Sequence, residues 1–458
     1  TGVVLISLLL AALPAPKNVE HLVGGHSANA TGFNAKFLAV LEWVSKLSYG
    51  NRAKITGPIV LIVGVAAVFF ALQIKIGNPV EGSGLLWDHS EYNEAIRQIN
   101  KNFPGVNTLE IVLEAKDPKN PDRVAKLADT FVTAQALQKD LENGAFKPRA
   151  TLSIGDYFGE GQRLFAGGNP KWIPVDPTNE QVSAAAMVSM AGSSPKAFSH
   201  VADFELQNST ISLWYPDNKQ ETVDAALASA KAAVEKAGID HDAFRVRLGT
   251  GTIALQQAMN NVVDRFHYVI ISLLSLVIGI GCSLAYRSVV AALILLIPVN
   301  LANFVLTATI HLMGVGLDIN TLMVAAIGVG VGIDYGIYLL SRICEEYHAQ
   351  GEDWGRAITA SLTTTGKAIM FTAIIMLMGI APWYFMSELK FMADMGLLLM
   401  MIMAINMVLA LVVLPLLVWY IKPSFVKSKD IFVGEGVDLS LFTDVGDRKL
   451  DGTLAPAK

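Results

Sequence analysis

The residue best placed to do chemistry is Asp334, the one acidic residue well inside a long apolar stretch of this sequence. It stands in the segment Gly328-Val-Gly-Val-Gly-Ile-Asp-Tyr-Gly336, about eight residues before Arg342, which is roughly 12 Å along a helix. A carboxylate in hydrocarbon costs on the order of 3 kcal/mol, so we expect Asp334 to face a protein interior or a water-filled cavity. Desolvation favours the protonated carboxyl, which suits a group that takes a proton from one side and gives it to the other.

Glycines surround Asp334 and predict close helix packing. Gly328, Gly332 and Gly336 recur every four residues, so they share one helix face that a second helix can approach closely. We assign these three and Gly330 to helix packing. In an alternative interpretation, a lysine on another helix neutralises Asp334 and the carboxylate only completes an ion pair.

Other motifs lack a residue that their chemistry needs. Gly249-Thr250-Gly251 lacks both the third glycine of a dinucleotide fingerprint and the Lys-Ser/Thr of a P-loop. Thr365-Gly366-Lys367 has no glycine five residues before Gly366 and no hydroxyl residue after the lysine. The eight histidines form no i, i+4 pair, and both cysteines lie in or beside apolar stretches. The sequence therefore predicts no metal site and no nucleotide.

Composition places the chain in a membrane. Of its 458 residues 52% are hydrophobic and 16% charged, against about 25% charged in an ordinary soluble protein. The net charge of −5 and the lack of a long Lys/Arg run argue against a nucleic-acid partner. Six apolar stretches approach or exceed the roughly 20 residues that span a bilayer. They cover about residues 55–74, 268–286, 289–313, 319–340, 368–386 and 392–420.

Lysines and arginines near the ends of these stretches all fall on one side, which the positive-inside rule makes cytoplasmic. We therefore predict a multi-pass protein of the bacterial inner membrane with its large polar domain in the periplasm. The predicted organisation is as follows: residues 1–16 are the end of a preceding transmembrane helix, 17–54 a cytoplasmic linker with an amphipathic helix, 55–74 a transmembrane helix, 75–266 a periplasmic α/β domain, 267–421 a five-helix transmembrane bundle, and 422–458 a cytoplasmic tail.

The first residues repeat a feature of the last apolar stretch. Leu13-Pro14 precedes a lysine, just as Leu414-Pro415 precedes Lys422. Because the chain also starts with Thr1, we expect a homologous first half whose facing helix packs beside Asp334.

A helix is expected over residues 33–49, with Phe37, Leu41 and Val44 at helical spacing. The pattern favours a helix lying on the inner leaflet. The alternative is a helix docked on the protein.

The polar domain mixes strands and helices. Alternating apolar residues predict strands around Ile111, Ile211 and Val246, and helices are expected from Pro121 and over 222–237. This order is typical of a split βαβ, ferredoxin-like domain. Residues 155–209, rich in Gly, Pro, Ser and Met, are expected to be either a mobile substrate-lining segment or a long surface loop with a short helix at 180–190.

Several segments together carry a family resemblance. They are Gly330-Val-Gly-Ile-Asp334-Tyr335, Leu339-Leu340-Ser-Arg342, Glu345-Glu346, Arg356-Ala-Ile, Thr363-Thr-Thr365 and Gly366-Lys-Ala-Ile-Met-Phe. They resemble two successive helices of the resistance-nodulation-division (RND) superfamily, in particular its hydrophobe exporters and its MMPL-like branch. One span, an external domain and five further spans are similar to the C-terminal half of such a transporter. The full family pattern has twelve spans and two external domains.

This resemblance implies a polytopic α-helical membrane protein with a ferredoxin-like, porter-type α/β domain, as one half of a pseudo-twofold repeat. It implies a transporter, not an enzyme, that uses the proton motive force to export hydrophobic or amphipathic molecules or lipids. Protons are then the coupling ion, and no other cofactor is expected. Asp334 and Tyr335 are the implied proton relay, with a hydroxyl of the Thr363–Thr365 run, Thr364, as a weaker candidate.

The implied partners are a lipid-like substrate, membrane lipids and a homologous N-terminal half in the same or a separate chain. A second copy of the protein and a periplasmic partner are further candidates. Two other functions stay open at this point. One is a lipid-sensing or protein-export accessory of the same superfamily. The other is an intramembrane aspartyl protease, which needs two intramembrane aspartates where this sequence has Asp334 alone.

Overall fold

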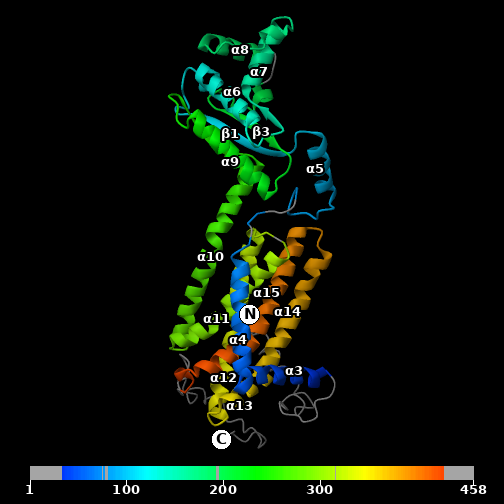
Figure 1. Cartoon of the computed structure of the whole chain (residues 1–458), viewed down its shortest axis with the longest axis vertical. Coiled ribbons are helices and arrows are strands. Elements are labelled where there is room, and N and C mark those ends of the chain that lie inside the picture. Colours follow the sequence, from blue (N-terminus) through cyan, green and yellow to red (C-terminus); the bar gives the residue numbers. More distant parts are fainter. Residues whose placement is uncertain (1–32, 75, 78–80, 192–194, 315, 428–458) are drawn as a thin grey trace, which may run out of the picture.

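Long apolar helices form a bundle beneath an α/β domain in the computed structural model of this chain (Figure 1). The structure describes residues 33–427 apart from 75, 78–80, 192–194 and 315. The predicted helix end at residues 1–16 and the tail beyond residue 427 lie outside the described residues.

Six helices of the described part are long and apolar enough to cross a membrane. They are α4 (Gly50–Ala71), α10 (Thr252–Ala285), α11 (Val289–Leu312), α12 (Ile319–Ala349), the continuous run of α13 (Trp354–Ser361), η4 (Leu362–Gly366) and α14 (Lys367–Met386), and α15 (Lys390–Ile421). Helices satisfy their backbone N–H and C=O groups internally, as a lipid environment requires. Among these helices α15 is central, because it packs against α11, α12 and α14.

The amphipathic helix expected near the N-terminus is α3 (Phe33–Ser48). Its Leu41 and Val44 are buried in the bundle core, where α3 packs against α15, α4 and η4. Trp43 on the other face is 58% exposed. The helix is therefore docked on the protein through one face, as in the alternative interpretation, and its tryptophan stays free to meet a membrane surface.

The α/β domain is built on a four-stranded sheet in the order β2-β3-β1-β4. Its strands are β1 (Asn107–Ala115), β2 (Ala150–Leu152), β3 (Ser209–Tyr215) and β4 (Phe244–Thr250). Every pairing is antiparallel. Alternate residues of β1 are buried, as the sequence pattern predicted. This strand order is that of the ferredoxin-like fold, so the expected fold class is confirmed.

Helices α6 (Ala128–Asn143) and α9 (Gln220–Ala237) pack on each other and on this sheet. The prediction that the first of them starts at Pro121 was wrong. Arg123 has the left-handed φ of 54°, and a short 3-10 turn, η1 (Val124–Lys126), precedes the true helix. A left-handed residue cannot continue an α-helix, so the apolar spacing alone placed the start too early.

The short helix expected at 180–190 is confirmed, but the expectation that the rest of residues 155–209 is a loop or mobile segment was wrong for much of its length. Helices α7 (Ile154–Phe165) and α8 (Asn179–Ala191) share a separate apolar core with the short turn η3 (Pro195–Phe198). A further short turn, η2 (Pro170–Trp172), lies between the two helices in the chain and has no buried residue. Their glycines permit this packing, because a Cβ at Gly161 would lie 2.2 Å from the hydroxyl oxygen of Ser189. Close helix contact thus accounts for Gly161, whereas Gly167 and Gly168 have left-handed φ values of 75° and 81° and form the turn after α7.

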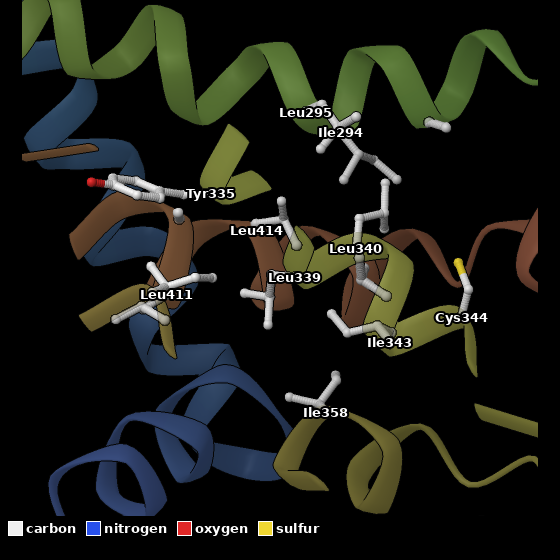
Figure 2. Close-up of a cluster of buried hydrophobic side chains, with 14 of the residues drawn as sticks. Ile294, Leu295, Tyr335, Leu339, Leu340, Ile343, Cys344, Ile358, Leu411 and Leu414 are labelled. Atoms are coloured by element: carbon white, nitrogen blue, oxygen red, sulfur yellow. The ribbon is translucent and has the colours of Figure 1, made fainter. Parts of the chain in front are cut away.

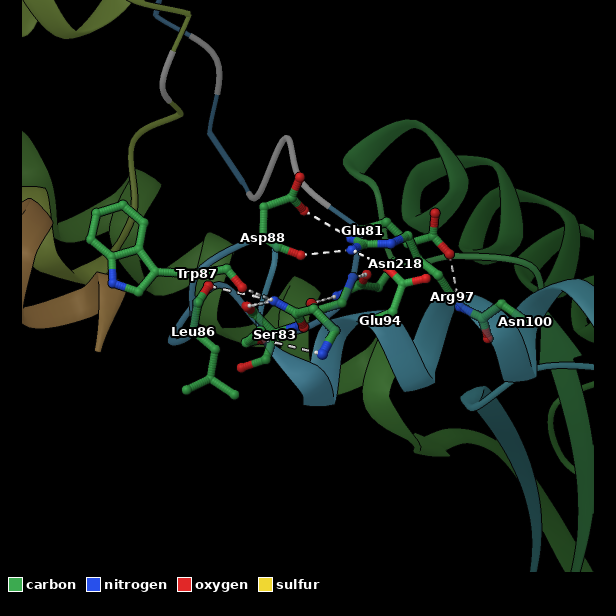
Figure 3. Close-up of polar contacts among 12 residues, drawn as sticks. Glu81, Ser83, Leu86, Trp87, Asp88, Glu94, Arg97, Asn100 and Asn218 are labelled. Atoms are coloured by element: carbon green, nitrogen blue, oxygen red, sulfur yellow. Dashed lines mark hydrogen bonds and ion pairs between the residues drawn. The ribbon is translucent and has the colours of Figure 1, made fainter. Parts of the chain in front are cut away.

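A polar junction joins the domain to the bundle through α5 (Glu91–Asn102) and the segment before it (Figure 3). Asn93 is buried and donates to the carbonyl oxygens of Ser83 and Trp87. Arg97 bonds Asp88 and Glu94, and its guanidinium lowers the pKa of Glu94. The Trp87 Nε1 group donates over 3.1 Å to the carbonyl oxygen of Ser387, between α14 and α15. The edge strand β4 supplies a second connection, because α10 follows it directly and one 34-residue helix runs from the domain into the bundle.

Candidate functional site

Asp334 lies on an open face of α12. Its side chain is exposed, as are those of Gly330 and Tyr338, four residues before and after it. Residues four apart share one helix face. In the described chain this face is therefore not covered by the six-helix bundle.

A groove of about 740 Å³ runs along this face between α12 and α14. Asp334, Tyr335 and Thr365 line it together. Its other lining residues are Val331, Tyr338, Ser341, Arg342, Glu345, Ala368, Ile369, Thr372 and Met376. The groove thus combines the carboxyls of Asp334 and Glu345, several hydroxyls and an apolar wall, which are groups that can hold water and pass a proton.

Tyr335 differs from Asp334 in its surroundings. It is 5% exposed and shares a buried cluster with Leu339, Leu411 and Leu414 (Figure 2). Its hydroxyl oxygen lies 4.0 Å from the sulfur of Met376 on α14. The core fixes the ring and leaves the hydroxyl at the α12–α14 boundary.

The threonine run forms a π-helical turn, η4, inside the continuous helix from α13 to α14. Insertions of this kind occur often at functional sites. Thr364 donates its hydroxyl to the carbonyl oxygen of Ala360 over 2.8 Å and is not among the residues that line the groove. The structure brings Thr365, not Thr364, to the groove with Asp334.

Three of the four glycines on α12 face close neighbours. A Cβ at Gly328 would lie 2.4 Å from Ile402, one at Gly332 would lie 2.5 Å from Asn406, and one at Gly336 would lie 3.0 Å from Leu295. These neighbours belong to α15 and α11 of this same chain. Helices α11 and α15 of this chain thus already pack against Gly328, Gly332 and Gly336. These glycines therefore give no argument for a helix from a missing first half.

Gly330 does not share this role. A Cβ there would meet no described atom within 4 Å. The packing role predicted for Gly330 was wrong for the described helices. Two residues rotate a helix by about 200°, which turns Gly330 away from Gly328 and Gly332 and toward the Asp334 face.

Asn406 is a site residue that the sequence reasoning missed. It is 3% exposed, and its Nδ2 donates to the carbonyl oxygen of Gly328 over 2.8 Å. The available signal was an isolated amide in the apolar run Leu-Leu-Leu-Met-Met-Ile-Met-Ala-Ile-Asn-Met-Val-Leu. Polar side chains in such a run face other helices, where they find hydrogen-bond partners.

The end of the groove far from the α/β domain carries charge. Arg342 bonds Glu345 over 2.8 Å and Glu346 over 2.5 Å. Among the described residues no basic side chain lies within ion-pair distance of Asp334. The interpretation of Asp334 as a lysine-neutralised carboxylate therefore finds no support in the described bundle.

Candidate metal ligands do not gather in the described residues, where no group of three His, Cys, Asp or Glu side chains could hold a metal ion.

The MMPL family model matches residues 183–430, more than half of the 458 residues. The chain belongs to the MMPL family. The RND resemblance seen around Asp334 is therefore confirmed at the level of the superfamily.

Two relatives are similar over parts of the chain. A membrane protein of Methanocaldococcus jannaschii is 26% identical over 172 residues, or 36% of this chain and 44% of that protein. The trehalose monomycolate exporter MmpL3 of Mycolicibacterium smegmatis is 37% identical over 60 residues, or 13% of this chain and 6% of the exporter. The chain spans less than half the length of either relative.

A solved structure shares the fold. The hedgehog release protein Disp from the water bear Hypsibius dujardini superposes with a TM-score of 0.51 at 12% identity. The superposition covers 88% of this chain and 52% of Disp. The chain therefore has the architecture of about half of that protein.

Proposed function

We propose that this chain is the proton-coupled half of a membrane exporter for lipid-like or other hydrophobic molecules. The single observation that carries the proposal is Asp334, a carboxyl at membrane depth that lines a groove with Tyr335 and Thr365. Membership of the MMPL family and the similarity to a lipid exporter support the substrate class.

Asp334 acts in this proposal by changing its charge. When deprotonated it requires water or a hydrogen-bond donor, and when protonated it tolerates apolar surroundings. Uptake and release of a proton therefore change how tightly α12 and α14 close over the groove. Tyr335 and Thr365 orient the water or the carboxyl, because their hydroxyls both donate and accept hydrogen bonds.

Movement in the bundle has two routes to the α/β domain. The first is α10, which is continuous from the sheet edge to the far side of the bundle. The second is the junction in which Trp87 bonds Ser387 between α14 and α15. A shift of α14 relative to α12 therefore acts directly on residues that support the domain.

The exposed face of α12 that carries Asp334 is expected to pack against another part of the functional protein. Asp334 is exposed on this face, and a carboxyl that faces hydrocarbon costs on the order of 3 kcal/mol. We propose that a homologous half, in the same or a separate chain, packs on this face. The same proposal places the protein in a bacterial inner membrane with the α/β domain in the periplasm, since the lysines and arginines cluster on the other side.

The test is transport in vesicles that contain the full-length protein and a fluorescent lipid-like probe. We expect probe movement when a pH gradient is imposed and loss of movement when a protonophore collapses that gradient. Transport that is indifferent to the gradient would contradict proton coupling. Probe binding without movement at any gradient would favour a lipid-sensing or export-accessory role.

A further inference from the structure

A second groove lies on the bundle away from Asp334, between α4, α11 and α15. Its volume is about 750 Å³, and its wall is apolar. Pro58, Leu61 and Val65 of α4 form one side, and Leu301 of α11 with Leu417 of α15 form the other. Gly64 leaves room for the groove, since a Cβ there would already lie 3.3 Å from Leu301.

The length of this groove matches one leaflet of a bilayer. The α4 residues that line it run from Gly57 to Val68, or about 17 Å at 1.5 Å per residue. Half of the hydrocarbon core of a bilayer is about 15 Å thick. An acyl chain that enters from the side opposite the α/β domain can therefore lie along the whole groove.

Positive charge marks the entrance. Lys54 is exposed and precedes Pro58, Leu61 and Val65 by four, seven and eleven residues, so it stands on the same face of α4. The hydroxyl of Tyr420 donates over 2.8 Å to the carbonyl oxygen of Ala53, which ties the end of α15 to this turn.

Two further cations lie at this end of the bundle. Lys422 has its Nζ 4.9 Å from the ring centre of Trp419. Arg52 is exposed two residues before Lys54, and a rotation of about 200° over two residues places it on a different face of α4. Within the described residues neither Arg52, Lys54 nor Lys422 has a carboxylate at ion-pair distance. No acidic residue occurs in α4 or in the second half of α15. The entrance is therefore positive without a compensating charge from its own helices.

We propose that this groove binds one anionic phospholipid of the leaflet opposite the α/β domain. An acyl chain fills the space lined by Leu61, Val65 and Leu417. The headgroup phosphate meets Lys54, with Lys422 adding to the positive field. Basic sites between transmembrane helices select anionic headgroups in this way. The site does not depend on Asp334 or on proton coupling.

The experiment compares binding of phosphatidylglycerol and phosphatidylcholine with the same acyl chains to the detergent-solubilised full-length protein, measured by native mass spectrometry. We expect preferential retention of phosphatidylglycerol. Lys54→Ala should weaken that binding about fivefold, the effect of one lysine near an anionic surface. It should leave phosphatidylcholine unchanged. Lys46→Ala, an exposed lysine of α3, is the matched control and should change neither lipid.

A second variant tests the acyl groove itself. Val65→Trp fills the groove from its 63% exposed position and should weaken retention of both lipids. Val277→Trp, at a 60% exposed position of α10 outside the groove, should not. Equal binding of the two lipids, unchanged by Lys54→Ala, would overturn the proposal. Cross-linking of Val65→Cys to another protein segment, with no lipid retained, would also overturn it.

Discussion

The amide of Asn406 on α15 donates a 2.8 Å hydrogen bond to the carbonyl oxygen of Gly328 on α12. The same amide occupies the space that a Cβ at Gly332 would need. One buried side chain thus sets both the distance and the register between α15 and the helix that carries Asp334. The opposite face of α12 is left open toward the groove.

Gly332→Ala should therefore loosen this contact. The added methyl would lie 2.5 Å from the Asn406 oxygen, and overpacking of this kind typically costs about 1–3 kcal/mol. We expect a lower melting temperature in detergent. Gly330→Ala is the control, because its Cβ meets no described atom within 4 Å. Equal melting temperatures for the two variants would show that α12 and α15 pack differently.

The two neighbouring threonines should differ in their effect on transport. Thr365→Val removes a hydroxyl from the groove, so we expect transport driven by a pH gradient to fall several-fold. Thr364→Val removes a hydroxyl that is bonded to Ala360, and we expect little change. Initial rates in vesicles, normalised to protein content, measure the difference. The reverse order would restore Thr364 as the relay candidate.

Thr364 and Thr365 could not be told apart from the sequence, although other features of the fold could be predicted. Apolar runs predicted the spans, and alternation predicted three of the four strands, because both are local patterns that burial imposes directly. A π-helical turn inserts one residue into the helix and rotates everything after it. Spacing counted at 3.6 residues per turn therefore cannot tell Thr364 from Thr365.

Only some residues of the Asp334 site could be predicted from the sequence. A charged residue in an apolar run is visible in any sequence, so Asp334 and the adjacent Tyr335 could be found. The residues that pack against Gly328 and Gly332 could not be found from the sequence. Ile402 and Asn406 are more than 70 residues from these glycines in the chain and contact α12 only in the folded bundle. The folded core of α7 and α8 was missed because glycines that permit close packing look like loop residues.

Membrane topology can be tested by labelling in intact cells. Asp122→Cys in the α/β domain and Arg356→Cys at the start of α13 are both exposed positions. The native Cys282 and Cys344 are buried, so background labelling should be low. We expect an impermeant thiol reagent to label the first variant, and the second only after the cells are permeabilised. Labelling of the second variant alone would invert the topology.

Tyr215 should make the α/β domain sensitive to alkaline pH. It is fully buried at the end of β3 and stacks on Phe146, and burial raises its pKa to about 12. Its folded pKa lies above the unfolded value near 10, so the full stability is present below pH 10 and falls as pH rises toward 12. The loss is on the order of 2 kcal/mol. Melting curves of Tyr215→Phe should lack this decline, and identical alkaline curves for both proteins would contradict the prediction.

Asp334 is the proton carrier in the proposed mechanism. Asparagine keeps the size of the side chain, but it carries no charge and cannot exchange a proton. Asp334→Asn should therefore fold and insert normally, with an unchanged melting temperature or a higher one. Glu345→Gln is the control within the same groove, since Glu345 already bonds Arg342.

The decisive measurement is proton flux into vesicles that contain the full-length protein, followed with an enclosed pH-sensitive dye while a lipid-like substrate is transported. We expect flux in the wild type and in Glu345→Gln, a smaller flux in Tyr335→Phe, and background flux in Asp334→Asn at equal protein content. Wild-type flux in Asp334→Asn would contradict the role of Asp334 as the proton carrier.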